Sequence, residues 1–395
     1  TESQIVAIGS SVMSSATNAS NVIAIGHRAA EALSHNDSSG TIAIGALALE
    51  GANGSHTPNI AIGYRAINNA TTNVAGAVAI GYETLYANTD NTGNIAIGYF
   101  AMRDGTGGSS RDYNIAIGTE AMRSGNSHVS VAIGYTAGKN IKSGGTGVVH
   151  IGHAAGTYAS ASYNTFMGYQ AGHGGTTSAP YSSGEGNTAV GYGALDAFTT
   201  GNHNIAIGKD AAGALTTGAY NIILSPKTGN SGTSLGVTTG NSNVGIGYET
   251  LVALTDGASN VAIGTQAGMN AAGADNNIII GYQAGLNISS GGSNIIIGYR
   301  AADGGNVTNT TAIGYESLTA SDGTGMNLAL GFYTLHKLVK GGSTTALGNY
   351  AGQYATGSYN TFVGHEAGKG GTTSAPFSSG QSNTAVGYQA LDNFT

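Results

Sequence analysis

One eight-residue pattern of apolar and polar positions recurs along the whole chain. It is NIAIGYRA at residues 59–66, NIAIGYFA at 94–101, NIIIGYQA at 277–284 and NTAVGYQA at 383–390. With its glycine numbered as position 0, the pattern occurs 22 times, mostly at intervals of 16 to 18 residues, and Ser225 replaces the glycine once. Self-similarity at a short fixed period is typical of solenoid proteins, in which each repeat forms one coil.

Each unit begins with a period-two run that ends at the glycine. Position −1 is almost always Ile, Val or Leu, position −3 is one of these in most units and Thr in six, and position −2 is usually Ala. This alternation predicts a strand, and the glycine suits a sharp bend. A second run at +1 to +4, often Tyr-x-Ala-Leu or Tyr-x-Ala-Gly, predicts a second short strand, and the Asn, Thr, Ser and Gly between runs predict turns. We therefore expect an all-β parallel β-solenoid, or β-roll, of about 22 coils of roughly 17 residues each.

Position −2 indicates a strand that is apolar on both faces. Its side chain points away from the face that carries positions −3 and −1. It is Ala in most units, Ile or Phe in five, and is almost never charged. A strand that is apolar on both faces is usually buried on both. We therefore expect positions −3 and −1 to fill the coil and position −2 to meet another copy in a homotrimer or filament. Replacing Ala96, Ala116 and Ala262 by Asp is then expected to dissociate the oligomer.

His150 occupies position −2 in the stretch VVHIGHAAG. If that face meets the axis of a trimer, three copies of His150 converge, and three imidazoles are a common ligand set for Zn, Ni or Fe. The alternative is a polar residue tolerated where the rod is locally open to water. His150 is the single metal-ligand candidate, and no cofactor is expected.

The composition excludes several classes of function. Only 8% of the 395 residues are charged, the net charge is −7, and no basic patch indicates a nucleic-acid partner. No apolar run approaches the roughly 20 residues that cross a bilayer, so we expect no membrane contact by this segment. The 20 Asp and Glu form no recurring pair in the sequence, and no GxSxG motif marks a nucleophile, so we expect no enzyme. Because both Thr1 and Thr395 fall within a repeat, we expect a segment of a longer fibre.

The repeat resembles those of two kinds of surface protein. The phrase NxAIGxxA resembles the head repeats of trimeric autotransporter adhesins, and NTAVGYQALDNFT at 383–395 is similar to repeats of phage tail-fibre proteins. The units here are longer than those of the adhesin heads. The resemblance implies left-handed parallel β-rolls wound as homotrimers, located extracellularly at a cell surface or virion surface. It implies a structural fibre or adhesin segment that extends and presents binding tips.

A longer repeat divides the chain into two homologous blocks, 1–199 and 200–395. Each block contains one lengthened unit with the insertion GGTTSAP. An insertion in a solenoid coil loops out from its surface, so display or contact is one explanation and recent duplication is the other. The candidate display residues are Thr176, Thr177, Pro180, Thr372, Thr373 and Pro376.

Tyrosine and asparagine each recur at a fixed position of the repeat. Tyr occupies +1 in 11 units and Asn occupies −4 in 14. Stacked Asn side chains are expected to form a hydrogen-bonded ladder, with a role as ligand donors as the alternative. The tyrosines are expected to stack over the glycine backbone with their hydroxyls in water. The functional alternative is a carbohydrate-binding module that recognises a host-surface glycan or protein through this ladder or the GGTTSAP loops. The glycan-contact candidates are Tyr64, Tyr82, Tyr99, Tyr282 and Tyr299.

Overall fold

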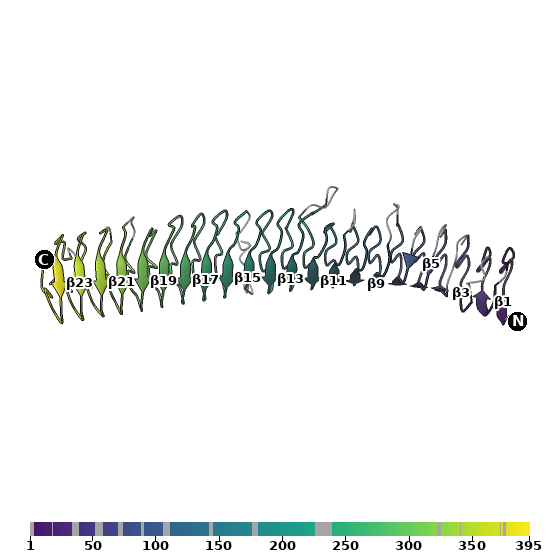
Figure 1. Ribbon diagram of the computed structural model, residues 1–395, viewed down its shortest axis with the longest axis horizontal. Coiled ribbons are helices and arrows are strands. Elements are labelled where there is room, and N and C mark those ends of the chain that lie inside the picture. The colour runs from purple at the N-terminus through teal and green to yellow at the C-terminus, as the bar shows by residue number, and fades with distance from the viewer. Residues whose placement is uncertain are drawn as a thin grey trace. The chain divides into compact units, whose positions relative to one another are not determined.

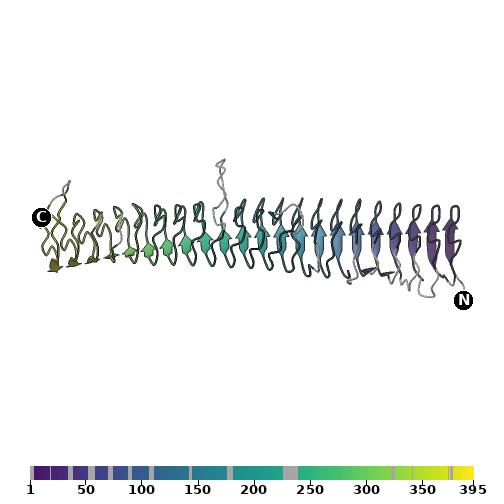
Figure 2. The ribbon, with the colours of Figure 1, turned by 90° about the horizontal axis from the view of Figure 1, so that it is seen from above.

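The chain winds into coils, each of which adds one short strand to a parallel sheet. The computed structural model describes residues 4–17, 19–33, 39–51, 58–69, 74–87, 91–105, 111–141, 145–175, 181–225, 239–321, 325–339, 341–371, 373 and 377–395. This part contains strands, turns and bends and no helix, as Figure 1 and Figure 2 show from two directions. The expected all-β parallel solenoid is confirmed.

Two compact units make up the chain, Thr1–His203 and Asn204–Thr395. In the first unit, β5 (Val74–Ala75) and β7 (Asn91–Thr92) form a small parallel sheet of their own. The main sheet of the first unit consists of β1 (Ile5–Ile8), β2 (Val22–Ile25), β3 (Ile42–Ile44), β4 (Ile60–Ile62), β6 (Val78–Ile80), β8 (Ile95–Ile97), β9 (Ile115–Ile117), β10 (Val131–Ile133), β11 (Val149–Ile151), β12 (Thr165–Met167) and β13 (Thr188–Val190). The sheet of the second unit consists of β14 (Ile205–Ile207), β15 (Ile222–Leu224), β16 (Val244–Ile246), β17 (Val261–Ile263), β18 (Ile278–Ile280), β19 (Ile295–Ile297), β20 (Thr311–Ile313), β21 (Leu328–Leu330), β22 (Thr345–Leu347), β23 (Thr361–Val363) and β24 (Thr384–Val386).

Position −2 faces the interior of the coil, so the expected assignment of the two strand faces is wrong. Ala96, Ala116 and Ala262 are all 0% exposed within the single chain. In-register pairing places each −2 side chain above the −2 side chain of the next coil, as with Ala61 and Ala79. The space inside the coil is narrow because a second segment of the same coil packs against this row, and Ala is the −2 side chain that most coils accommodate.

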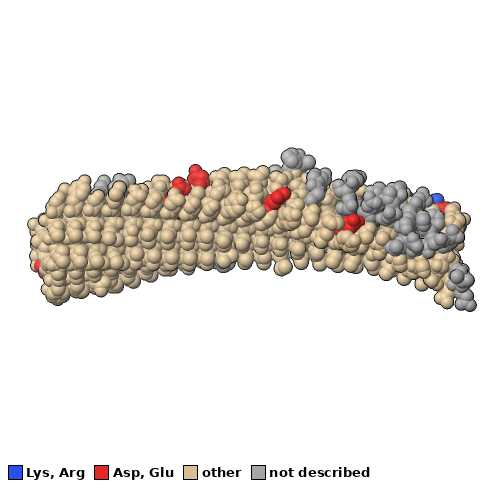
Figure 3. Space-filling model, viewed as in Figure 1, with Lys and Arg blue, Asp and Glu red and all other residues tan. Residues whose placement is uncertain are grey.

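The side chains at −3 and −1 form the outer face of each sheet instead. Ile278 is 41% exposed, Ile295 40% and Leu328 40%, whereas the −2 residue of each of these strands is buried. The second unit therefore carries a largely apolar sheet face that its own chain leaves exposed, and in the first unit most side chains of the same rows are half-buried. In the view of Figure 3, the face turned toward the reader shows almost no charged side chains.

The glycine at position 0 is required by close contact between neighbouring coils. Gly63 has φ of 131°, which disfavours any other residue. A Cβ at Gly63 would lie 2.2 Å from the carbonyl oxygen of Gly81 in the next coil. The same contact recurs between Gly81 and Gly98, so the glycines form a column in which the main chains touch. This column confirms the bend expected at position 0 and adds a steric reason for it.

The segment from +1 to +4 is not the second strand that the sequence predicts. Positions +2 and +4 have left-handed backbone angles in most coils, as in Glu83 (φ 49°) and Leu85 (φ 53°). These two residues donate their N–H groups in opposite directions, Glu83 to Tyr64 of the preceding coil at 2.9 Å and Leu85 to Ala101 of the next coil at 3.2 Å. Hydrogen bonds to both neighbouring coils offset the cost of these angles. These left-handed angles could not be predicted from residue type, because Glu and Leu seldom adopt a φ above zero.

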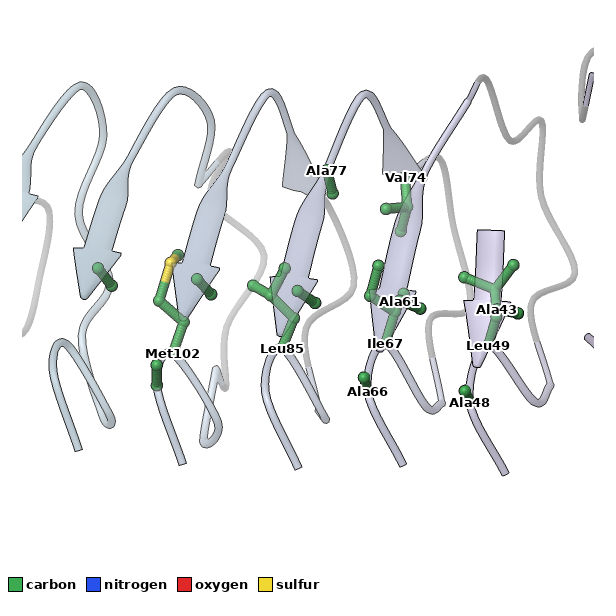
Figure 4. Close-up of a cluster of buried hydrophobic side chains, with 14 of the residues drawn as sticks. Ala43, Ala48, Leu49, Ala61, Ala66, Ile67, Val74, Ala77, Leu85 and Met102 are labelled. Carbon is green, nitrogen blue, oxygen red and sulfur yellow. The ribbon is translucent and has the colours of Figure 1, made fainter. Parts of the chain in front are cut away.

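The interior is filled by matching the sizes of positions −2 and +4. Where −2 is Ala, +4 is often a large apolar residue, and Figure 4 shows Leu49, Ile67, Leu85 and Met102 in these places. Where −2 is Phe, +4 is Gly: a Cβ at Gly172 would lie 2.4 Å from the Phe166 ring, and a Cβ at Gly368 would lie 2.1 Å from the Phe362 ring. In these coils one bulky side chain fills the interior. In coils with Ala at −2 and Gly at +4, such as Ala262 and Gly268, Leu251 and Ile279 of the neighbouring coils fill the space beside the glycine.

The asparagines at −4 form the expected ladder. In the second unit, Asn221 donates its backbone N–H to Oδ1 of Asn204 at 2.9 Å and its Nδ2 to the same atom at 3.1 Å. Nδ2 of Asn221 also donates to the carbonyl oxygen of Gly240 at 2.8 Å. Asn243 repeats this arrangement on Asn221. These side chains are buried and bonded within the chain, which leaves them no role as ligand donors.

The size matching predicts a rescue between two core positions. Phe166→Ala should lower the free energy of unfolding by about 3–5 kcal/mol, because it leaves a cavity. Gly172→Leu alone should also destabilise, because Leu would overlap the Phe166 ring. The double variant should recover much of the loss, since Leu at +4 opposite Ala at −2 is the pairing of Ala189 and Leu195.

Denaturant unfolding of the two single variants and the double variant measures this coupling. Leu195 adopts φ of 53°, close to the 54° of Gly172, so the backbone accepts Leu at that position. Strictly additive losses would contradict the size-matching account.

Candidate binding surface

The tyrosines at +1 stack into an exposed aromatic ladder in each unit, as expected. In the first unit, the ring centroids of Tyr64 and Tyr82 are 5.1 Å apart, and those of Tyr82 and Tyr99 are 5.2 Å apart. In the second unit, Tyr282 and Tyr299 are 5.3 Å apart. The spacing follows from the strand-to-strand distance of about 4.8 Å. The exposed fractions of Tyr64, Tyr82 and Tyr99 are 36% to 48%, so these rings present a flat apolar edge to solvent.

A second stretch of the ladder in the first unit lies beyond Thr119, which occupies +1 between Tyr99 and Tyr135. His153 takes the +1 place between Tyr135 and Tyr169, with centroid distances of 5.0 and 4.8 Å. Tyr192 extends this row at 5.0 Å. In the second unit, Tyr315 follows Tyr299 at 4.9 Å. The candidate residues therefore lie in two rows, one in each unit.

Charged side chains gather in rows at +2, +5 and +6, which sequence reasoning missed. In the first unit, Glu83 at +2 binds Arg103 at +5 of the next coil, with Oε2 and Nε 2.6 Å apart. Arg103 binds Asp104 at 2.9 Å, and Asp104 binds Arg123 at 2.7 Å. Glu120 then joins Arg123 to Lys139. The sequence does place these charged residues at the same positions of successive repeats, but the sign of the charge alternates irregularly.

These ion pairs shift the ionisation of the groups within the row. Burial raises the pKa of Glu120, and its bonds to Lys139 and Arg123 outweigh this effect and leave the pKa below its ordinary value. Burial lowers the pKa of Arg123, and its bonds to Asp104 and Glu120 more than reverse that effect. The row is therefore a chain of charges that bond from coil to coil.

His150 lies inside its own coil and not on a face that another chain can reach. It is 0% exposed, its ring stacks on Phe166 with centroids 5.0 Å apart, and a Cβ at Gly156 would lie 2.4 Å from it. Neither ring nitrogen has a hydrogen-bond partner. Three copies of His150 cannot converge from this position, so the geometric basis of the metal hypothesis is lost. Among the described residues, no group of three or more His, Cys, Asp or Glu could hold a metal ion.

The GGTTSAP insertions lie mostly outside the described residues. Thr176, Thr177, Pro180, Thr372 and Pro376 are among those not described, and Thr373 is exposed.

The residues that flank the insertions are anchored alike in both units. Gly175 and Gly371 donate to the carbonyl oxygens of Phe198 and Phe394 at 2.8 and 2.9 Å. Ser182 and Ser378 donate their hydroxyls to the same two carbonyls at 2.7 Å. Both insertions thus leave and rejoin the solenoid through the same contacts.

His150 predicts a dependence of stability on pH. Burial lowers its pKa from 6.5 to about 3 in the folded chain. Well above pH 6.5 the imidazole is neutral in both the folded and the unfolded chain, and its contribution to the free energy of unfolding is complete. As the pH falls from 6.5 toward 3, the unfolded chain binds the proton first, and stability is lost. His150→Phe should therefore narrow the gap in melting temperature between pH 7 and pH 4.

Circular dichroism melts at both pH values test this expectation. His153→Phe is the matched control, because its ring stands at the surface in the aromatic ladder. An unchanged gap in the His150→Phe variant would show that the buried imidazole is not the source of acid sensitivity.

Comparison with known proteins assigns no function to the candidate surface. The chain matches no protein-family model, no curated protein and no solved structure. The described residues include no helix long and apolar enough to cross a membrane.

Proposed function

We propose that the chain is a structural segment of a homotrimeric fibre or adhesin, displayed outside a cell or on a virion, in which each of the 22 repeat units forms one coil. Its role is mechanical: it extends, spaces and presents binding tips. The observation that carries the proposal is the apolar outer face of the sheet. A soluble shaft with that face uncovered would aggregate, so a partner of matching shape has to cover it.

The size of this face supports a second copy of the chain as the partner. Position −1 is apolar in every coil and position −3 in most, with Thr in the others, and many of these apolar side chains are close to 40% exposed. Over the second unit their exposed area adds up to on the order of 1,000 Å². That exceeds the few hundred Å² of a typical monomer and matches the roughly 800 Å² that each partner buries in a stable interface. Two copies of the same chain also have the same rise at each coil, so their outer faces align coil by coil along their whole length. The number three comes from the resemblance to the trimeric adhesin heads.

A second candidate function is recognition of a host-surface glycan by the tyrosine ladders. It is favoured by the stacked and exposed rings of Tyr282 and Tyr299, since aromatic faces present apolar surface to the C–H groups of sugars. Replacing both by Leu and measuring retention on a glycan array tests this candidate. Retention that survives the replacement would remove it.

Charges on the outer face should separate the copies without unfolding them. We expect the triple variant Ile278→Glu, Ile295→Glu and Leu328→Glu to sediment as a monomer with strand content retained, because unpaired charges oppose burial between chains. Sedimentation velocity with circular dichroism measures both properties.

The control places the same kind of charge on the inner face. Ala262→Asp should instead lower the melting temperature, because Ala262 lies inside the coil. A monomeric parent, or a triple variant with the mass of the parent, would contradict the proposed assembly.

A further inference from the structure

The second unit contains a groove of about 440 Å³. It lies along repeat positions +2, +5 and +6, which in the first unit are occupied by the row of ion pairs. Four consecutive coils contribute to it through positions +2, +5 and +6. Its polar lining includes Asn287, Arg300, Asp303, Glu316, His336 and Lys337.

The two units use the same rows in different ways. In the first unit, Glu83 and Glu120 each meet a cation at 2.6 Å, and the row is a continuous chain of bonds. In the second, Arg300 and His336 both lie 3.9 Å from the Glu316 carboxylate, and the Tyr333 hydroxyl donates a hydrogen bond to it, which leaves its other lone pairs unused by any close cation. Its side chain is only 14% exposed. A carboxylate that is mostly buried and lacks a close cation is available to accept hydrogen bonds from a ligand.

The charges that line the groove balance one another. Arg300 and Lys337 are positive, and Asp303 and Glu316 are negative. Asp303 accepts a bond of 2.6 Å from Nε of Arg300, so this pair is fixed in place. Burial lowers the pKa of His336, which keeps its ring neutral at pH 7. A lining of this kind attracts neither a polyanion nor a cation strongly, but it offers donors and acceptors side by side.

Apolar surfaces adjoin these polar groups. The Tyr333 ring meets the His336 ring edge-on, with centroids 4.8 Å apart, and it follows Glu316 in the +2 row. Leu286 and Ala320 contribute aliphatic lining. Hydroxyl groups match the mixed donors and acceptors, and the C–H faces of a sugar ring match the aromatic and aliphatic surfaces. Four coils span about 14 Å along the axis, which suits a chain of sugars better than a single one.

We infer that this groove binds an uncharged oligosaccharide, with Glu316 accepting and Arg300, Lys337 and Asn287 donating hydrogen bonds to its hydroxyls. The inference is independent of the fibre proposal, because a shaft needs no groove, and of the tyrosine ladders, because the lining residues belong to other rows of the repeat.

The test is binding of the full 395-residue chain to an array printed with neutral and acidic oligosaccharides. Ala320→Phe fills the groove without removing a charge, and Glu316→Gln removes the acceptor charge while keeping the shape. We expect the parent to retain neutral oligosaccharides and both variants to bind at least tenfold more weakly.

Matched controls come from the same repeat positions in the first unit. Ala87 and Ala320 both occupy +6, and each donates its backbone N–H to the +5 residue of the next coil, Arg103 and His336 respectively. Ala87→Phe and Glu83→Gln should leave retention unchanged, and melting curves confirm that each variant folds. A parent that retains no neutral oligosaccharide, retention of acidic ones alone, or Ala320→Phe binding as well as Ala87→Phe would each overturn the inference.

Discussion

The structure depends on contact between the main chains of neighbouring coils at position 0. With the carbonyl oxygen of the next glycine 2.2 to 2.7 Å from where a Cβ would lie, as at Gly63 and Gly247, no side chain fits there. Once the glycines are stacked, each coil is in register with the next, and each position of the repeat stacks on the same position of the neighbouring coil. Tyrosine meets tyrosine at the surface, asparagine meets asparagine in the interior, and apolar side chains form continuous rows.

Register also explains how a chain with few charges and no disulfides holds together. Parallel strand pairing, the asparagine ladder and the bonds made by +2 and +4 all run from coil to coil. Stability is then close to a sum of similar interfaces between neighbours, so local variation is tolerated. His150 is an example, because a buried imidazole without hydrogen bonds survives in a row of alanines by stacking on Phe166.

The period, strand, glycine bend and both ladders could be predicted from the sequence, because each is visible as one residue type at one position. The direction in which the strand faces could not be read from alternation alone, since both faces are apolar. A further signal was present in the residues: Phe166 and Phe362 occur with Gly172 and Gly368, whereas Ala79 occurs with Leu85. Such compensation in size means that −2 and +4 share one enclosed space.

The groove was beyond prediction for a different reason. It depends on which charged side chains of four coils form close ion pairs. Glu83 lies 2.6 Å from Arg103, whereas Glu316 lies 3.9 Å from Arg300, and the sequence does not reveal this difference. The left-handed angles at +2 and +4 were equally hidden, because they are imposed by bonds to neighbouring coils and not by residue type.

The most direct test of the account is to compare the removal of one whole coil with the removal of half a coil. Deleting residues 260–276 joins Ser259 to Asn277 and restores the sequence pattern, whereas deleting 260–267 joins Ser259 to Gly268 and shifts every later position out of its row. If each repeat is one coil held in register by its neighbours, the first deletion should keep the melting temperature within a few degrees of the parent. The second should lower it strongly and broaden the transition. Equal losses of stability from the two deletions, measured by thermal melting under the same conditions, would contradict the account.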